Sequence, residues 1–256
     1  MASCKLCHKE GRLCLSHIVP EFVYAPLYDS GRKMIGFLED REGIRSHLIQ
    51  KGLRETLLCS ICERHINRNF EQPNLELWRK LAAYDESANT EWKLFTTPEG
   101  SKVVLVSGVD YRSFKLMLLS ILWRASVSTR HEYSEVSLGR HEKPIRRMIL
   151  EGDAGPRYCY PCILFKFDEP GVILRPIRRR INGHRVYHFI LTTIHVWYFV
   201  SGHIADEPII DLALREDGVF SAIRLDPRET QLYTELRRLE RETKHSRSVV
   251  RRINAK

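Results

Sequence analysis

Two pairs of cysteines near the start of the chain constrain its fold more than any other feature. Cys4 and Cys7 form one CxxC pair, and Cys59 and Cys62 form the other. Two intervening residues let both thiolates of a pair lie on one tight turn, and two such turns supply the four sulfurs of a closed tetrahedral zinc site. The sequence therefore predicts structural Zn²⁺ bound by Cys4, Cys7, Cys59 and Cys62.

Other cysteines and a histidine leave alternatives to this ligand set. Cys14 and His8 are substitutes for one ligand, and some of the cysteines could simply be small buried hydrophobic residues. A third pair, Cys159 and Cys162, has no partner pair and opens an expected strand, which favours ordinary packed cysteines. The chain has seven cysteines, and in a reducing compartment metal binding is a more common use of such pairs than disulfides.

Composition is that of a globular protein, with 256 residues, 43% hydrophobic and 29% charged. The longest apolar run, residues 189–200, contains His195 and is shorter than the ~18 residues that a membrane-spanning helix needs. The N-terminus has no apolar signal stretch. We therefore expect a cytoplasmic protein with no membrane partner.

Patterning divides the chain into two parts. Residues 15–24 and 33–38 are typical of strands, a helix is expected over 60–72 until Pro73 ends it, and Asn74 is expected to cap a second helix through residue 83. Residues 85–101 have the composition of a linker. We therefore predict a first domain of residues 1–84, a linker of residues 85–101 and a second domain of residues 102–256.

The second part is expected to combine a core helix with an antiparallel sheet. A strand at 102–106 precedes a strongly apolar helix over 111–127 that Asp110 caps, and a shorter helix follows at 141–150. Strand patterns run from 158 to 214, and a last helix is expected at 227–243. The predicted fold class is α+β.

An arginine-rich hairpin carries much of the net charge of +9, since residues 171–190 hold five arginines and no acidic residue. Asn182-Gly183 favours a type I′ turn that pairs Arg180 with Arg185. Opposed like charges destabilise a strand pair unless an anion or acid compensates them, and guanidinium groups bind phosphate in bidentate fashion. One face of the hairpin is therefore a candidate for nucleic-acid binding, with Tyr187 stacking on a base: Arg178, Arg180, Arg185 and Tyr187. The alternative is a solvated face, or one paired with acids such as Asp206, Glu207 and Asp211.

The first eighty residues also carry an ordered motif. The first CxxC is followed by Leu15-Ser16-His17-Ile18-Val19-Pro20, and the second opens LLCSICE. This arrangement resembles the zinc-ribbon HNH group of His-Me finger nucleases, and is most similar to bacterial proteins with the pattern CxxC, SHIIP and LLCxxCE. The resemblance implies a zinc-bound ββα-like module in residues 1–84. It also implies an endonuclease, dependent on Mg²⁺ or Mn²⁺, that hydrolyses phosphodiester bonds of DNA or RNA in bacterial phage defence.

The resemblance assigns roles to individual residues. His17 matches the general base that deprotonates the attacking water. The alternatives for His17 are a metal ligand, or a structural histidine whose ring hydrogen-bonds the backbone. The helix after Cys62 offers Glu63, Asn67 and Glu71, which share one face because they are four residues apart. His65 lies off that face. Glu63 and Glu71 are the preferred ligands for the catalytic ion, with His65 next.

Two departures from the family pattern keep a second function open. Ser16 stands where HNH nucleases usually place an Asp or His ligand, and the Asn that usually precedes the second CxxC is missing from LRETLLC. The alternative is a non-catalytic zinc protein that binds nucleic acid or a protein partner in a larger assembly.

Overall fold

The computed structural model describes residues 2–40, 43–83, 92–98, 100–167, 172–201 and 208–225. Its N-terminal part is organised by strand β1 (Leu13–His17), which pairs antiparallel with β4 (Arg54–Cys59) and places His17 opposite Arg54. The long connection between these strands contains helix α1 (Glu21–Tyr24), a 3₁₀ turn (Ala25–Leu27) and a hairpin of β2 (Met34–Asp40) with β3 (Gly43–Ile49).

A continuous helical run follows β4 without a loop. It consists of α2 (Ser60–Ile66), a π-helical turn (Asn67–Glu71) and α3 (Gln72–Ala82). The expected break at Pro73 is wrong: Pro73 lies in the first turn of α3, where its missing N–H costs little, and the π turn before it changes the hydrogen-bond spacing. The expected cap at Asn74 is also wrong, because Asn74 is buried and its amide donates to Phe70 O at 2.7 Å and to Ser113 Oγ at 3.1 Å.

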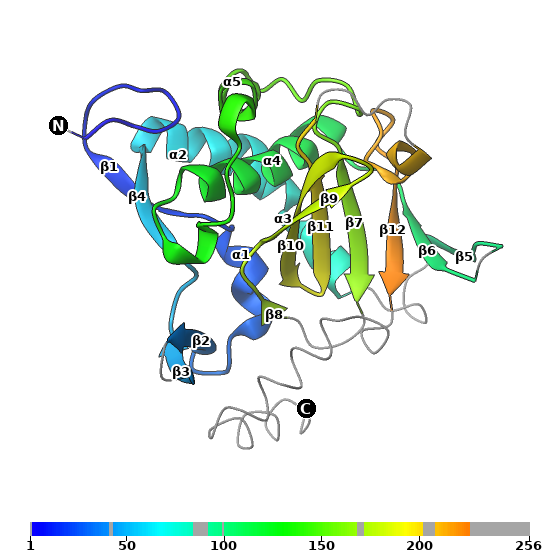
Figure 1. The fold of residues 1–256 in the computed structure, drawn as a ribbon, viewed down its shortest axis with the longest axis horizontal. Coiled ribbons are helices and arrows are strands. Elements are labelled where there is room, and N and C mark those ends of the chain that lie inside the picture. The colour runs from blue at the N-terminus through cyan, green and yellow to red at the C-terminus, as the bar shows by residue number, and fades with distance from the viewer. Residues whose placement is uncertain are drawn as a thin grey trace.

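Helix α4 (Tyr111–Val127) forms the centre of the core. Asp110 caps it as predicted, since its carboxylate accepts from the backbone N–H of Ser113 at 3.3 Å. Every residue from Ser113 to Ala125 is buried, so the helix has no polar face in water. In Figure 1 it lies between the β1–β4 pair with α2 at one end and the large sheet at the other.

An eight-stranded sheet covers the other side of α4. Its pairing order is β5, β6, β12, β7, β11, β10 and β8, with β9 also pairing with β10, and only the β12–β7 pair is parallel. The strands are β5 (Lys93–Thr96), β6 (Lys102–Val106), β7 (Cys162–Phe167), β8 (Val172–Ile173), β9 (Ile177–Ile181), β10 (His184–Thr192), β11 (Ile194–Phe199) and β12 (Phe220–Leu225). The predicted α+β class is confirmed.

The arginine hairpin has the predicted register. β9 and β10 pair Ile181 with His184, Arg180 with Arg185 and Arg178 with Tyr187. Asn182 and Gly183 both have positive φ, of 47° and 80°, as a type I′ turn requires. Helix α5 (Glu142–Glu151) also matches its expected range. The helix expected at residues 227–243 lies outside the described residues.

The two parts of the chain share one hydrophobic core. A single cluster of buried side chains extends from Cys4 through Trp78 and Phe114 to Phe220. Residues 93–96 were expected in a linker but form β5, the edge strand beside β6. Hydrogen bonds also join the parts, among them Thr193 Oγ1 to Ala82 O at 3.0 Å.

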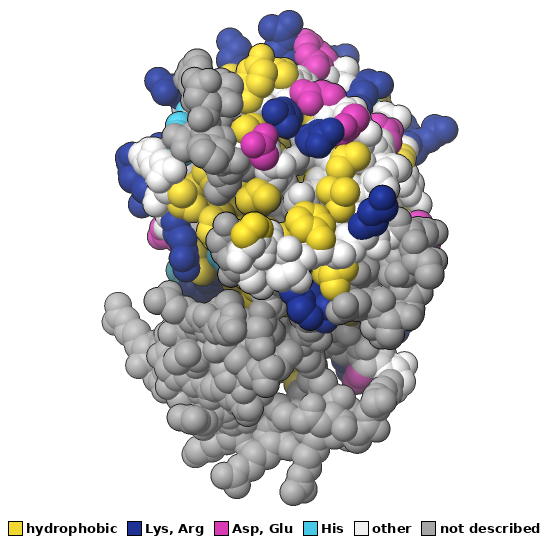
Figure 2. Space-filling model, turned by 90° about the vertical axis from the view of Figure 1, so that its right-hand side faces the viewer, with side chains coloured by type: hydrophobic (Ala, Val, Ile, Leu, Met, Phe, Trp, Pro, Cys, Tyr) yellow, Lys and Arg dark blue, Asp and Glu magenta, His cyan; other side chains and the backbone are white. Residues whose placement is uncertain are grey.

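The surface beside β5 and β6 mixes apolar and charged side chains. Figure 2 shows this side of the molecule, with hydrophobic groups lying among Lys, Arg, Asp and Glu side chains. Phe95 of β5 is 44% exposed at the edge of the sheet. Among the residues described, none of the helices combines the length and apolar character needed to cross a bilayer.

Candidate functional site

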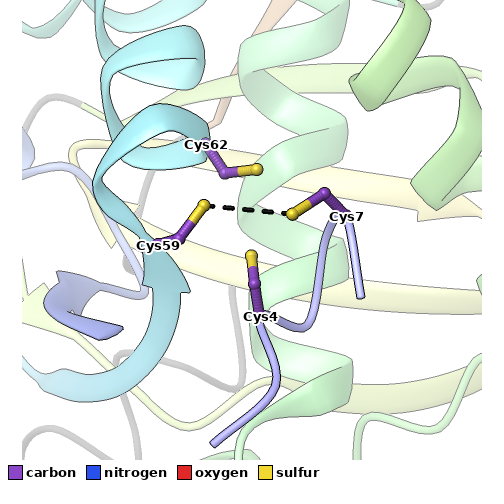
Figure 3. Close-up of side chains that lie close together, drawn as sticks. All are labelled: Cys4, Cys7, Cys59 and Cys62. Carbon is purple, nitrogen blue, oxygen red and sulfur yellow. Dashed lines mark hydrogen bonds between the residues drawn. The ribbon is translucent and has the colours of Figure 1, made fainter. Parts of the chain in front are cut away.

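Four cysteines that are distant in sequence meet in the N-terminal part of the structure, with their sulfurs pointing toward one another (Figure 3). All four Sγ atoms lie within 4.8 Å of one another, and those of Cys7 and Cys59 are 3.9 Å apart. A tetrahedral site with Zn–S bonds of ~2.3 Å has sulfurs about 3.8 Å apart, so these spacings fit a zinc ion. The four residues predicted as ligands, Cys4, Cys7, Cys59 and Cys62, can therefore hold a metal ion such as zinc.

The local backbone explains why the two pairs meet. His8 N donates to Cys4 O at 2.9 Å and closes the first turn, and Lys5 N donates to Leu57 O at 3.0 Å and ties that turn to β4. Cys59 ends β4, and Cys62 lies in the first turn of α2, where the unpaired N–H groups of a helix stabilise a thiolate.

Burial opposes the ionisation of Cys7 and Cys62, whereas at Cys59 hydrogen bonds from Cys62 and the other two cysteines outweigh burial and lower the pKa to about 7. Cys4 and Cys62 are 0% and 4% exposed, and burial, together with the neighbouring thiols, raises the pKa of Cys62. Four thiolates in this space repel one another unless a divalent ion balances their charge. In the described part of the chain, no other group of three or more Cys, His, Asp or Glu residues has this closeness, and Cys14 and His8 stay outside the cluster.

The third cysteine pair has no metal-binding partners among the described residues. Cys162 is buried, and burial raises the pKa of its thiol to about 12. Cys159 is half-buried, and its pKa is raised by burial as well. Both thiols are protonated at neutral pH, which agrees with ordinary packed cysteines.

His17 lies at the end of β1, beside the zinc module and partly open to solvent, with a side chain 26% exposed. Its Nε2 lies 2.9 Å from Glu21 Oε2, but the two groups are not aligned for a hydrogen bond. Among the described residues, Nε2 has no hydrogen-bond partner. Burial lowers the pKa of His17, Arg54 and Arg124 lower it further, and Glu21 and Glu71 oppose them. The imidazole is therefore neutral at pH 7, as a general base must be.

Ser16 and Glu63 form one pair beside this histidine. Ser16 is fully buried, and its hydroxyl donates to Glu63 Oε2 at 2.6 Å. The serine thus orients the carboxylate that the sequence assigned to the catalytic ion. Only one oxygen of Glu63 is used in this bond, and the residue is half-buried.

Glu71 is committed to a different partner. Its Oε1 accepts from Arg124 Nη2 at 2.7 Å, and its Oε2 accepts a long bond of 3.4 Å from Asn67 Nδ2. Arg124 is 1% exposed and also donates from Nη1 to His17 O at 2.7 Å. A carboxylate already neutralised by a buried guanidinium is a poor ligand for a second cation, so the preference for Glu71 as a metal ligand does not fit this geometry.

His65 points away from His17. Its Nε2 lies 2.9 Å from Ile149 O on α5, and its Nδ1 lies 3.0 Å from Asn69 Nδ2. Both ring nitrogens are thus engaged, which argues against His65 as a metal ligand or a catalytic group. The backbone of α5 and the side chain of Asn69 give it a structural role between two helices.

Several arginines near α2 are open to a ligand. Arg54 stands directly opposite His17 in the β1–β4 pair and has no side-chain hydrogen bond or ion pair with the described residues. Arg64 and Arg68 are exposed, likewise lack such partners there, and line a shallow depression together with His65 and Asn69. These three guanidinium groups are free to bind phosphate.

The arginine hairpin presents fewer free groups than the sequence predicted. Tyr187 is 0% exposed, and its hydroxyl donates to Ser137 O at 2.6 Å, so its ring is not available to stack on a base. Arg185 donates to the same carbonyl at 2.9 Å, and Arg180 donates to Gly183 O at 3.2 Å. The predicted stacking of Tyr187 on a base is therefore wrong, because the side chain of Tyr187 points into the core. Arg178 and Arg180 remain exposed.

Glu21, Arg54 and Arg124 were not singled out from the sequence. None of the three had a signal in the sequence, because only the tertiary structure places them beside His17. The four positions from His17 to Glu21 run from the end of a strand to the start of a helix, so helical spacing does not apply to them. Comparison of the chain with protein-family models, with curated proteins and with solved structures finds no match.

Proposed function

We propose that this protein is a nuclease that hydrolyses phosphodiester bonds of nucleic acid, with His17 as general base. The setting of His17 supports the proposal: a neutral, half-buried imidazole ends β1, a carboxylate faces one ring nitrogen, and the free Arg54 lies across the strand pair. The chain order β1, β4, α2, with cysteines at the start of α2, is also the order that the resemblance to HNH nucleases leads one to expect.

In this proposal each residue has a distinct task. Nε2 of His17 faces Glu21, which leaves Nδ1 to take a proton from the attacking water. Arg54 binds a non-bridging phosphate oxygen and orients the substrate. A zinc ion at the four cysteines would hold the turn at Cys4 against α2 and support the β1–β4 pair, which is a structural role.

A divalent cation would stabilise the charge that develops on the phosphate. Mg²⁺ in such sites is commonly held by one or two carboxylates, with water and substrate phosphates completing its ligands. Glu63 is the residue suited to this, because Ser16 occupies only one of its oxygens. Glu71 is not, because of its pairing with Arg124.

The test is cleavage by a His17→Ala variant. We expect its rate on labelled DNA and RNA, with Mg²⁺ or Mn²⁺ present, to fall about 10²- to 10⁴-fold, because that is the usual contribution of a positioned general base. His131→Ala is the matched control, since His131 is an exposed histidine and its loss should leave the rate unchanged. Equal rates for the wild type and His17→Ala, purified in parallel, would rule out this mechanism.

A second candidate function is a non-catalytic zinc module that binds nucleic acid. It is favoured by the pairing of Glu71 with Arg124, which removes one of the two carboxylates expected to bind the catalytic ion. This candidate predicts that nucleic acid binds without being cut and that Mn²⁺ titrated into the zinc-loaded protein finds no second site.

Both candidates require phosphate contacts, and the exposed arginines provide a prediction. Replacing Arg178 and Arg180 by glutamine is expected to weaken nucleic-acid binding and to reduce the slope of log K against log salt by about 0.9 for each lost duplex phosphate contact. Arg64→Gln with Arg68→Gln gives the matched comparison for the depression beside α2. A pair whose replacement leaves both affinity and slope unchanged does not contact nucleic acid.

A further inference from the structure

We propose that Glu21 is the positioning residue for His17: its fixed carboxylate, 2.9 Å from Nε2, holds the ring in place and favours the protonated imidazole that forms when the base takes up a proton. The inference rests on the proposed function for its catalytic meaning, but the geometry it asserts can be tested whether or not the protein cleaves nucleic acid.

The backbone brings the two side chains together. His17 is the last residue of β1, and Glu21 is the first residue of α1, four positions later. The chain turns at Pro20, which precedes the helix and is buried. This turn points the carboxylate back at the ring, with Glu21 Oε2 2.9 Å from His17 Nε2.

The carboxylate is itself held by two donors. The hydroxyl of Tyr28 donates to Oε1 at 2.7 Å, and the backbone N–H of Gly52 donates to Oε2 at 3.2 Å. Burial and the neighbouring carboxylate raise the pKa of Tyr28, so its hydroxyl stays protonated and remains a donor at neutral pH. Glu21 is thus fixed before any substrate binds.

Gly52 is required at its position for a steric reason. A Cβ atom there would lie 2.3 Å from the ring of Tyr24, so only glycine lets the backbone N–H come close enough to donate to Glu21. The hydroxyl of Tyr24 in turn accepts from Leu53 N at 3.3 Å, which fixes the same loop. The segment just before β4 is therefore shaped around the Glu21 carboxylate.

The backbone of His17 is anchored from the opposite direction, by the bond from Arg124 to its carbonyl. The imidazole is thus restrained both through its main chain and through Nε2. Four charged groups act on it: Glu21 and Glu71 favour the protonated ring, while Arg54 and Arg124 oppose it. A carboxylate that orients a catalytic imidazole and stabilises its protonated form is a general device of nucleophile and base activation.

The test is NMR of the His17 ring in the zinc-loaded wild type, in Glu21→Gln and in Tyr28→Phe. Because the Glu21 carboxylate raises the pKa of His17, Glu21→Gln should lower that pKa. Tyr28→Phe should cause a smaller change than Glu21→Gln, since the carboxylate and its charge remain and only one of its donors is lost. Glu151→Gln, which removes an exposed carboxylate paired with Arg147, is the control and should leave the ring unchanged.

Cleavage is the second measurement. In Glu21→Gln, kcat should fall roughly tenfold to a hundredfold with KM little changed, and the low-pH limb of activity should shift to lower pH. Glu21→Asp, which keeps the charge, should recover part of the loss. If the His17 ring has the same pKa in Glu21→Gln as in the wild type, the positioning role is wrong even if the protein cleaves. If the ring responds but the wild type cuts no nucleic acid, the positioning stands and the nuclease proposal fails.

Discussion

Replacing Cys62 by serine is expected to abolish zinc binding and to unfold the N-terminal part of the protein. The apparent free energy of zinc binding to four ligands of this type is ~10–16 kcal/mol in small zinc domains. Even ~4 kcal/mol of this, at roughly 2–4 °C per kcal/mol for a chain of this size, lowers the melting temperature by about 10 °C. The effect is large because a zinc ion here would join residues 4–7 to residues 59–62, which are distant in the sequence.

The measurements are metal content and thermal unfolding, each with and without a chelator. One zinc ion per chain is expected in the wild type, and hydrogen exchange should rise first in β1, β4 and α2 when the ion is removed. Cys14→Ser and Cys159→Ser are matched controls, since both cysteines lie outside the cluster. Normal zinc content in Cys62→Ser, or loss of zinc in Cys159→Ser, would contradict the assignment.

Arg124→Met is expected to destabilise the folded protein by about 3–5 kcal/mol, the usual cost of leaving one partner of a buried ion pair without its counter-charge. Arg124 is 1% exposed and joins three elements, since it donates to Ser120 O in α4, to His17 O in β1 and to Glu71 in the π turn. Its loss leaves the Glu71 carboxylate buried with only a long bond from Asn67.

Denaturation with urea measures this effect. Arg147→Met is the matched control, because Arg147 pairs with Glu151 on the surface, where such pairs contribute ~0–1 kcal/mol. Adding Glu71→Leu to Arg124→Met removes the buried carboxylate that has lost its counter-charge, so the double variant should recover part of the lost free energy of unfolding. The double variant also gives a folded protein for measurement if Arg124→Met does not fold. Equal costs for Arg124→Met and Arg147→Met would show that the pair does not stabilise the core.

Features governed by local chemistry could be predicted from the sequence. The helix over 111–127 could be predicted because its cap, Asp110, and its apolar residues follow one another directly in the sequence. The Asn182-Gly183 turn determines the register of β9 and β10 by itself. The meeting of the four cysteines, which could hold a metal ion such as zinc, was also predictable, because CxxC spacing presents two sulfurs on one turn and two such turns complete a tetrahedral site.

Features that depend on distant partners could not be predicted. Asn74 has the residue type of a helix cap, but the π turn before Pro73 carries the helix through, and Ser113 gives its amide a buried partner. Residues 93–96 have the composition of a linker, but in the folded protein they form a strand because they pair with β6. Tyr187 was assigned to a solvent-facing side because alternation tells which residues share a face, but not that β10 is covered on both faces here, where Val186 and Tyr187 are both 0% exposed.

The sequence by itself determined the two cysteine pairs, the central helix, the hairpin register and His17 as the histidine to examine, since each depends on spacing within a short segment. Only the tertiary structure decided which charges surround that histidine. Glu21, Arg54, Glu71 and Arg124 act on its ring from α1, β4, the π turn and α4. Electrostatic and hydrogen-bond partners are chosen by proximity in space, and proximity between residues 17, 54, 71 and 124 exists only once the shared core has formed.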